Sequence, residues 1–93
     1  MNKTIANGND FTQLLSAHYT DLTKSERRIA DFIRKNQDES SFLAAAEVAN
    51  RLNLSEATIV RFARTLGYCS YPALRENLQE NFRSRITHSS RLR

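Results

Sequence analysis

Two arginines three residues apart are the side chains of this sequence best suited to bind an anionic partner. Arg61 and Arg64 lie in a segment with helical periodicity, and at 100° per residue they fall on one face. Ala57 and Val60 share that face and are small enough to let the helix approach a partner closely. A guanidinium can hold a phosphate, or the O6 and N7 atoms of guanine, through two parallel hydrogen bonds. The pattern predicts a surface that enters the major groove of DNA.

Polar residues at the start of the same segment extend this candidate surface. Ser55 is a typical N-cap, and with the free amides of the first turn it could hold a phosphate. Glu56 stabilises the helix dipole and could accept a hydrogen bond from cytosine, and Thr58 either contacts DNA or completes the cap. An ordinary solvated helix face is the alternative at each position. The candidate DNA-binding residues are Ser55, Glu56, Ala57, Thr58, Val60, Arg61 and Arg64.

A second basic group precedes this segment in the chain. Lys24, Arg27 and Arg28 follow one another closely near the start of a predicted helix. They are candidate phosphate contacts, with a solvated helix face as the alternative.

Catalytic and metal-binding patterns are missing from the sequence. No nucleophile is paired with a base, and no glycine-rich phosphate loop is present. His18 and His88 lack neighbours at metal-ligand spacing, and the single cysteine, Cys69, can form no internal disulfide. We therefore predict that the chain is not an enzyme and holds no cofactor or metal. With no secretory signal or membrane span in the sequence, we expect a cytoplasmic protein without a membrane partner.

The positive charge is concentrated in the C-terminal third of the chain. The net charge is +4, yet residues 59–93 contain seven arginines against only Glu76 and Glu80. Residues 1–58 carry seven basic and eight acidic groups. This asymmetry favours an anionic partner for the C-terminal third.

The elements that must position these residues are predicted to be helices. A chain of 93 residues with two glycines and one proline has room for one domain and few tight turns. Thr23 and Glu26 form the pattern of a capping box, which predicts a helix starting there. The expected helices begin near Asp10, which could cap the first, then at 24, 42, 56 and 70, with Ser40 or Ser41 capping the third and the last ending near Ile86.

Two of these helices form a predicted helix-turn-helix motif within residues 45–66. Asn53 tolerates the left-handed conformation of a tight turn, and Gly67 suits the position after the second helix. Ala49 would allow close approach of the two helices. The apolar positions expected between them are Val48, Leu52, Leu54, Ile59 and Phe62, with Leu66 on the same inner face.

The same residues resemble a known family. The chain from about residue 11 to 85 is similar to the N-terminal domain of RpiR-type bacterial transcription regulators, except that Ala44 stands where such proteins often carry Ser or Thr. The matching runs are Leu22 to Ala30, Val48-Ala49, Ser55 to Phe62, Leu66-Gly67-Tyr68 and Tyr71.

The resemblance implies an all-α DNA-binding domain of a regulator of carbohydrate metabolism, for which we expect a repressor. In such regulators a following SIS domain senses a phosphosugar, so the effector would bind through that domain, which this chain lacks. The expected organisation is a disordered start at residues 1–9, a five-helix homeodomain-like bundle at 10–86, and a basic tail or linker at 87–93.

The expected partner is double-stranded DNA, bound by a homodimer. One helix reading three or four bases discriminates weakly, so two copies on half-sites about 34 Å apart are the usual arrangement. The first helix, or an apolar stripe that could equally be core, is the candidate interface; the stripe comprises Leu74, Leu78, Phe82 and Ile86. The alternative function is a helical protein-interaction module whose basic face binds an acidic protein.

Overall fold

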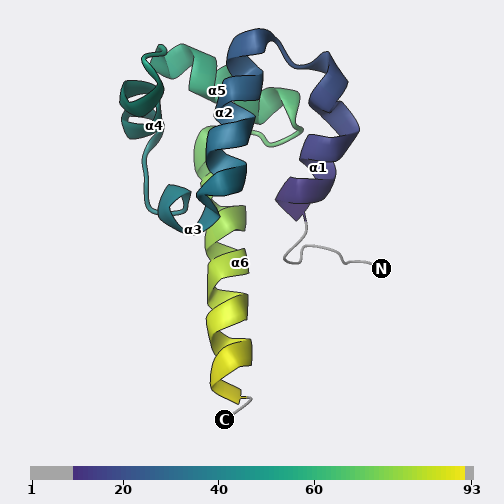
Figure 1. Cartoon of the computed structure of the whole chain (residues 1–93), viewed down its shortest axis with the longest axis vertical. Coiled ribbons are helices and arrows are strands. Elements are labelled where there is room, and N and C mark those ends of the chain that lie inside the picture. The colour runs from purple at the N-terminus through teal and green to yellow at the C-terminus, as the bar shows by residue number, and fades with distance from the viewer. Residues whose placement is uncertain (1–9, 92–93) are drawn as a thin grey trace.

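A computed structural model describes residues 10–91 of the chain, with the side chains of residues 11–86. Six α-helices and one short 3-10 helix fill this range, and no strand occurs within it (Figure 1). The helices are α1 (Asp10–His18), α2 (Lys24–Lys35), α3 (Gln37–Ser40), α4 (Ala45–Leu52), α5 (Glu56–Thr65) and α6 (Tyr71–Arg91), and η1 spans Tyr19–Asp21. The predicted all-α class with a helix-turn-helix is confirmed, with one helix more than expected.

The start of α2 confirms the predicted capping box. The Thr23 hydroxyl accepts a hydrogen bond from the Glu26 amide at 3.1 Å, and a Glu26 carboxylate oxygen accepts one from the Thr23 amide at 3.0 Å. Each side chain therefore satisfies a backbone donor that the first helical turn leaves free.

The region between α2 and α4 corrects the prediction of one helix from residue 42. Residues 37–40 form α3, and Ser41 closes it instead of capping the next helix. α4 starts only at Ala45, and Phe42 lies in the connecting loop with 64% of its surface exposed. The sequence contains no signal for α3, because a four-residue helix has too few apolar positions to show a periodicity.

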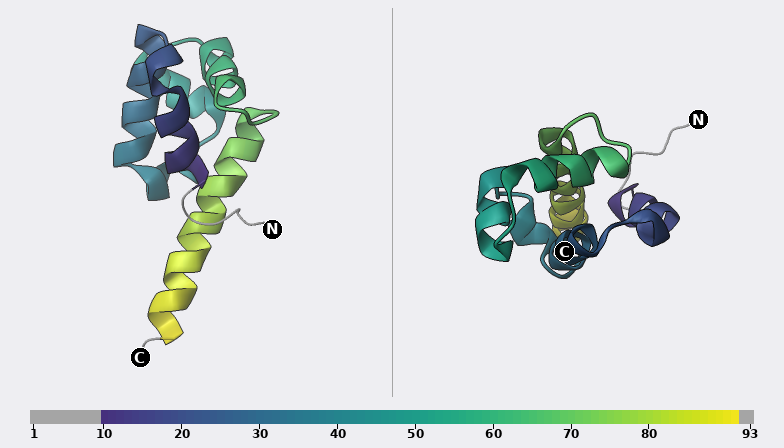
Figure 2. Two further views of the ribbon diagram at one scale, coloured as in Figure 1. Left: turned by 90° about the vertical axis from the view of Figure 1, so that its right-hand side faces the viewer. Right: turned by 90° about the horizontal axis from the view of Figure 1, so that it is seen from above.

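The last helix is longer than predicted. α6 continues to Arg91, whereas the sequence pattern placed its end near Ile86. Its C-terminal half extends away from the other helices in two perpendicular views (Figures 1 and 2). The expected disorder of residues 1–9 and the cap by the Asp10 side chain lie outside the described part of the structure, as do residues 92–93.

The core is formed where the N-terminal half of α6 meets the other helices. In Figure 2 the view from above shows α4 on one side of α6 and α1 on the other. Side chains of all six α-helices except α3 contribute to the buried cluster. Its largest fully buried members are Tyr71, Phe11, Phe62, Ile29, Ile33, Ile59, Leu66, Leu74, Leu78 and Val48.

Candidate nucleic-acid interface

The turn between α4 and α5 has the geometry that the sequence predicts. Asn53 adopts a left-handed conformation with φ 59° and ψ 43°, and it is the one non-glycine residue with positive φ among the described residues. The Leu54 amide then donates to the carbonyl of Ala49 at 2.9 Å. This closes the end of α4 and sends the chain directly into the next helix.

The first turn of α5 is capped by Ser55. Its hydroxyl accepts a hydrogen bond from the Thr58 amide at 3.2 Å and lies 2.8 Å from the Thr58 hydroxyl. Ser55 is exposed and Thr58 is half-buried. The structure therefore gives both residues the cap role that the sequence allowed, and leaves the Ser55 side chain at the surface.

One face of α5 belongs to the core, as predicted. Ile59, Phe62 and Leu66, which directly follows α5, are fully buried, and Ala63 between them is buried as well. Across the motif, Val48 and Ala49 of α4 are buried, while Leu52 and Leu54 pack partly buried against the same cluster. Burial of this face fixes the rotation of α5 about its own axis, because a charged group turned inward would lose its hydration.

The opposite face of α5 is open to solvent. Ala57, Arg61 and Arg64 are exposed together with Glu56, and Val60 is half-buried. Neither arginine forms an ion pair with a carboxylate in the described part of the chain; the Arg61 guanidinium only approaches the Thr58 hydroxyl at 3.5 Å. Both guanidinium groups are thus available to an external anion.

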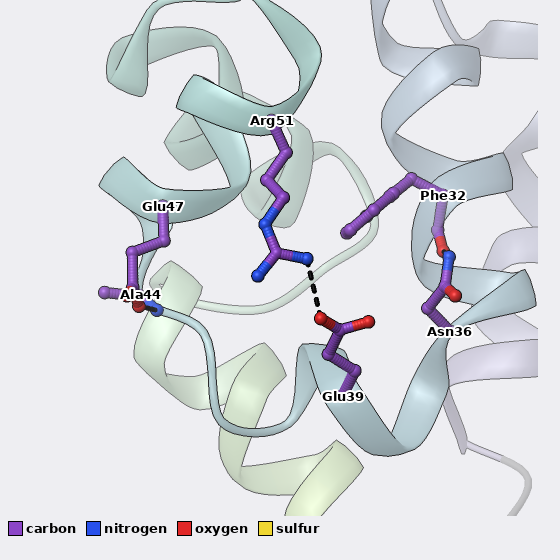
Figure 3. A network of polar contacts seen from close by, with 6 residues as sticks. All are labelled: Phe32, Asn36, Glu39, Ala44, Glu47 and Arg51. Carbon is purple, nitrogen blue, oxygen red and sulfur yellow. Dashed lines mark hydrogen bonds and ion pairs between the residues drawn. The ribbon is translucent and has the colours of Figure 1, made fainter.

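Two polar contacts that were not predicted from the sequence hold α4 in place (Figure 3). Ala44 precedes the helix without a hydroxyl, so only half of a capping box forms, in which Glu47 accepts from the Ala44 amide at 2.8 Å. Arg51 reaches across to Glu39 of α3, with 2.7 Å between the paired atoms. Sequence reasoning missed this pair, because its partners are 12 residues apart in different helices.

Two of the three predicted phosphate contacts on α2 have partners inside the domain. The Arg27 guanidinium lies over the Tyr19 ring, 5.5 Å from its centroid. Arg28 donates to the backbone carbonyl of Leu52, the last residue of α4, at 2.7 Å. Both side chains are exposed, as is Lys24. Sequence spacing could not predict the Arg28 contact, because its partner lies 24 residues away.

Two arginines of α6 form ion pairs with carboxylates. Arg83 pairs with Glu80 at 3.2 Å, and Arg85 pairs with Asp38 of α3. They lie toward the C-terminal end of α6, whereas α5 lies at the other end of the molecule (Figure 1). The positive charge of the C-terminal third is therefore divided between two separate regions.

Burial changes the acidity of one residue at the start of α6. Tyr71 is 1% exposed, and burial raises the pKa of its hydroxyl to about 12, an effect that the nearby Arg75 partly opposes. The hydroxyl has no hydrogen-bond partner among the described residues. Tyr71 belongs to the same buried cluster as Ile59 and Phe62 of α5, so it is not part of the exposed face.

Other kinds of site find little support in the described residues. No group of three or more His, Cys, Asp or Glu side chains within 10–91 is arranged to hold a metal ion. Cys69 is exposed and carries no disulfide. None of the helices in this range is long and apolar enough to cross a membrane.

Comparison with known proteins shows the family. Residues 10–85 match the helix-turn-helix domain of the rpiR family, and the chain belongs to that family. The class is that of the DNA-binding helix-turn-helix domains of transcriptional regulators, and these domains are not enzymes. The resemblance predicted from the motifs is confirmed, and so is the prediction that the chain is not an enzyme.

Individual relatives carry matching names. The chain is 48% identical over 50 residues to an uncharacterized HTH-type transcriptional regulator of Haemophilus influenzae, an alignment that covers 54% of the chain and 17% of that protein. It is 34% identical over 62 residues to the uncharacterized HTH-type transcriptional regulator YfhH of Escherichia coli, covering 67% and 22% respectively.

A third relative is the HTH-type transcriptional regulator HexR of Pseudomonas aeruginosa, 30% identical over 70 residues, which are 75% of the chain and 25% of HexR. The chain thus spans a quarter or less of these relatives' length. No solved structure is significantly similar to it.

Proposed function

We propose that this domain binds double-stranded DNA in a sequence-specific manner, with α5 as the helix that enters the major groove. The observation that carries the proposal is the outer face of α5, where two arginines without carboxylate partners among the described residues share a face with Ala57 and Val60 on a helix whose other face is core. A helix fits the major groove by width, and Arg is the commonest reader of guanine there.

Each candidate residue has a proposed role that matches its place on α5. Arg61 and Arg64 read base edges, and Ala57 and Val60 allow close approach, with Val60 near a thymine methyl group. Ser55 and Thr58 lie at the helix N-terminus, where backbone amides attract a phosphate. Glu56 accepts a hydrogen bond from the amino group of a neighbouring cytosine.

Of the three residues of α2 that the sequence suggested as contacts to the DNA backbone, one is favoured by its surroundings. Lys24 is exposed near the start of α2 and has no ion-pair partner among the described residues. Arg27 already lies over the Tyr19 ring and Arg28 already donates to the Leu52 carbonyl, so a phosphate would compete with contacts that the fold uses. We therefore assign phosphate contact first to Lys24.

We also propose that the domain works as a homodimer, because two-fold related half-sites double the number of bases read. The predicted stripe on α6 divides: Leu74 and Leu78 belong to the core, whereas Ile86 is 50% exposed. Phe82 is half-buried and its ring meets the exposed Phe42 edge-on at 5.5 Å. Phe42, Phe82 and Ile86 are the candidate apolar contact for a second copy.

The wider role is proposed from the family resemblance. We propose a cytoplasmic repressor of carbohydrate-metabolism genes, in which a phosphosugar effector acts through a SIS domain outside this chain and not on the helices described here. An operator that overlaps a promoter would then be blocked by the bound domain.

Selection from random duplexes tests the DNA-binding proposal directly. The purified chain is mixed with a pool of randomised duplexes at about 0.15 M salt, and the retained molecules are sequenced, since salt weakens sequence-independent binding more than base contacts. Enrichment of an inverted repeat is expected. Uniform weak retention without any sequence enrichment would contradict sequence-specific recognition by this chain, and would mean either that a further domain is needed to hold the dimer or that the basic face serves another partner.

Sedimentation equilibrium tests the dimer separately. The wild-type chain is compared with Ile86→Glu, which places a charge in the candidate apolar contact. The variant is expected to dissociate into monomers at a higher total concentration than the wild-type chain, and identical association curves would remove this patch as the interface.

A further inference from the structure

The end of α4 leaves backbone carbonyls without helical partners, as every helix end does. Two of them are satisfied by the turn that follows: Ala49 accepts from the Leu54 amide at 2.9 Å, and Asn50 accepts from the Asn53 amide at 3.4 Å. The carbonyl of Leu52 instead receives a hydrogen bond from the Arg28 guanidinium of α2, at 2.7 Å. This contact ties α2 to the turn of the motif.

The chemistry of the contact suits an arginine. A cation near the C-terminal end of a helix is attracted by the negative end of the helix dipole, and a charged donor makes a stronger hydrogen bond than a neutral one. Arg28 is the fifth residue of α2 and directly follows the first turn, whose backbone the capping box fixes. The backbone that carries Arg28 is therefore fixed, and its guanidinium has a favourable acceptor in the Leu52 carbonyl.

We propose that Arg28 is a positioning residue for sequence recognition: by holding the Leu52 carbonyl it sets the turn at Asn53 and thereby the placement of α5. α5 begins four residues after Leu52, so a displacement of the turn moves the start of α5 with it. Bidentate hydrogen bonds to a base edge depend on such placement, whereas attraction to phosphates tolerates small shifts. The inference rests on the proposed function of α5.

Arg27 provides a matched control next to Arg28. It carries the same charge in the same helical turn, but it lies over the Tyr19 ring and away from the motif. Arg27→Gln therefore removes equal charge without touching the turn. Arg28→Lys keeps the charge and a hydrogen-bond donor, so it tests rescue of the Arg28→Gln effect.

Amide hydrogen exchange in the DNA-free chain tests the positioning step by itself. In Arg28→Gln the amides of Asn53 and Leu54 are expected to exchange about fivefold faster, the equivalent of one net hydrogen bond. Arg27→Gln leaves them unchanged, and Arg28→Lys restores part of the protection. Unchanged exchange in Arg28→Gln would overturn the proposal whatever the DNA result.

The DNA arm separates a positioning residue from a phosphate contact. Binding to the duplex selected by the wild-type chain is compared with binding to a scrambled duplex over a range of salt concentrations, at a temperature where each variant is fully folded. Arg28→Gln is expected to lower the ratio of the two affinities about fivefold, in line with its exchange effect, and to leave the salt slope unchanged.

A different result identifies a direct phosphate contact. Loss of such a contact reduces the slope of log K against log salt by about 0.9 and weakens both duplexes equally. That outcome in Arg28→Gln would overturn the positioning role. If the wild-type chain itself prefers no duplex, the proposed function fails, while the exchange experiment still decides whether Arg28 holds the turn.

Discussion

α5 and α6 both present pairs of exposed arginines, but the two pairs differ in what surrounds them. Arg61 and Arg64 of α5 have no carboxylate partner in the described part of the chain, whereas Arg83 and Arg85 of α6 pair with Glu80 and Asp38. Arg83 and Arg85 belong to the C-terminal half of α6, which extends away from α5 (Figure 1). A count of arginines along the chain cannot distinguish these residues, whereas the fold shows which of them have carboxylate partners.

The difference indicates which basic region can serve a polyanion. A guanidinium paired with a carboxylate has part of its field cancelled and must lose that partner before it can hold a phosphate. An unpaired one on a capped helix has neither cost. The comparison therefore supports the proposal that α5, and not the C-terminal half of α6, binds DNA.

The largest expected effect comes from the inner face of α5. Ile59→Asp should lower the free energy of unfolding by about 4 kcal/mol or more, because it buries a charge where no partner exists. Thermal unfolding followed by circular dichroism measures the loss. Ala57→Asp on the exposed first turn is the control and should leave the melt nearly unchanged. A normal cooperative melt of the Ile59 variant would mean that the facing of α5 is wrong.

The inner face of α6 differs from that of α5 because it contains a buried hydroxyl. The unfolded chain releases the Tyr71 proton near its ordinary pKa of 10, whereas the folded protein retains it up to about 12. The free energy of unfolding is therefore unaffected by this residue's titration below pH 10. As the pH rises from 10 to 12, it falls by about 2 to 3 kcal/mol in total.

Tyr71→Phe isolates this contribution. The variant should flatten the alkaline loss of stability and, by removing a hydroxyl without a partner, should be no less stable than the wild type at neutral pH. Urea unfolding at a series of pH values provides the measurement. Tyr19→Phe, at an exposed position, should retain the wild-type profile, and an equally steep fall in Tyr71→Phe would show that another group causes it.

On the outer face of α5, Arg61→Ala should remove base discrimination and keep the fold. The affinity for the selected duplex is expected to fall by about 1 to 3 kcal/mol relative to a scrambled duplex, the range for one bidentate contact to a base. Fluorescence anisotropy titrations measure both affinities. An unchanged preference would move base recognition to another part of the domain.

The smallest effect is expected from the outer face of α6. Arg83→Ala removes the same charge as Arg61→Ala, but from an exposed ion pair worth about 0 to 1 kcal/mol. Neither the melting temperature nor the duplex preference should change appreciably in the same assays. A loss of DNA affinity as large as that of the Arg61 variant would break the contrast between the two helices.

Local signals in the sequence were sufficient for much of this structure. The Thr23 and Glu26 capping box, the left-handed Asn53 and the Ser55 cap all involve residues within a few positions of one another, so their geometry follows from residue type and spacing. The buried face of α5 follows from helical periodicity. The contacts of the proposed DNA-binding residues with DNA stay a prediction.

α3 was missed and the end of α6 was misplaced, because neither has a local signal in the sequence. α3 is too short to have a periodicity of its own, and it packs on α6 through a hydrogen bond from Gln79 to the Ser41 carbonyl at 2.9 Å. α6 extends past the predicted end at Ile86, where the apolar pattern had already stopped. A pattern of hydrophobic residues reports burial, so a helix end that leaves the core has no such signal.

The sequence by itself therefore determined the helical class, the motif and the residues that face outward on α5, because caps, turns and periodicity act over one or two helical turns. Only the tertiary structure decided which arginines are unpaired and which serve the fold. Arg28 meets Leu52 and Arg85 meets Asp38 across gaps of 24 and 47 residues. Such pairs exist only once the helices have packed, since packing alone brings each guanidinium within reach of its acceptor.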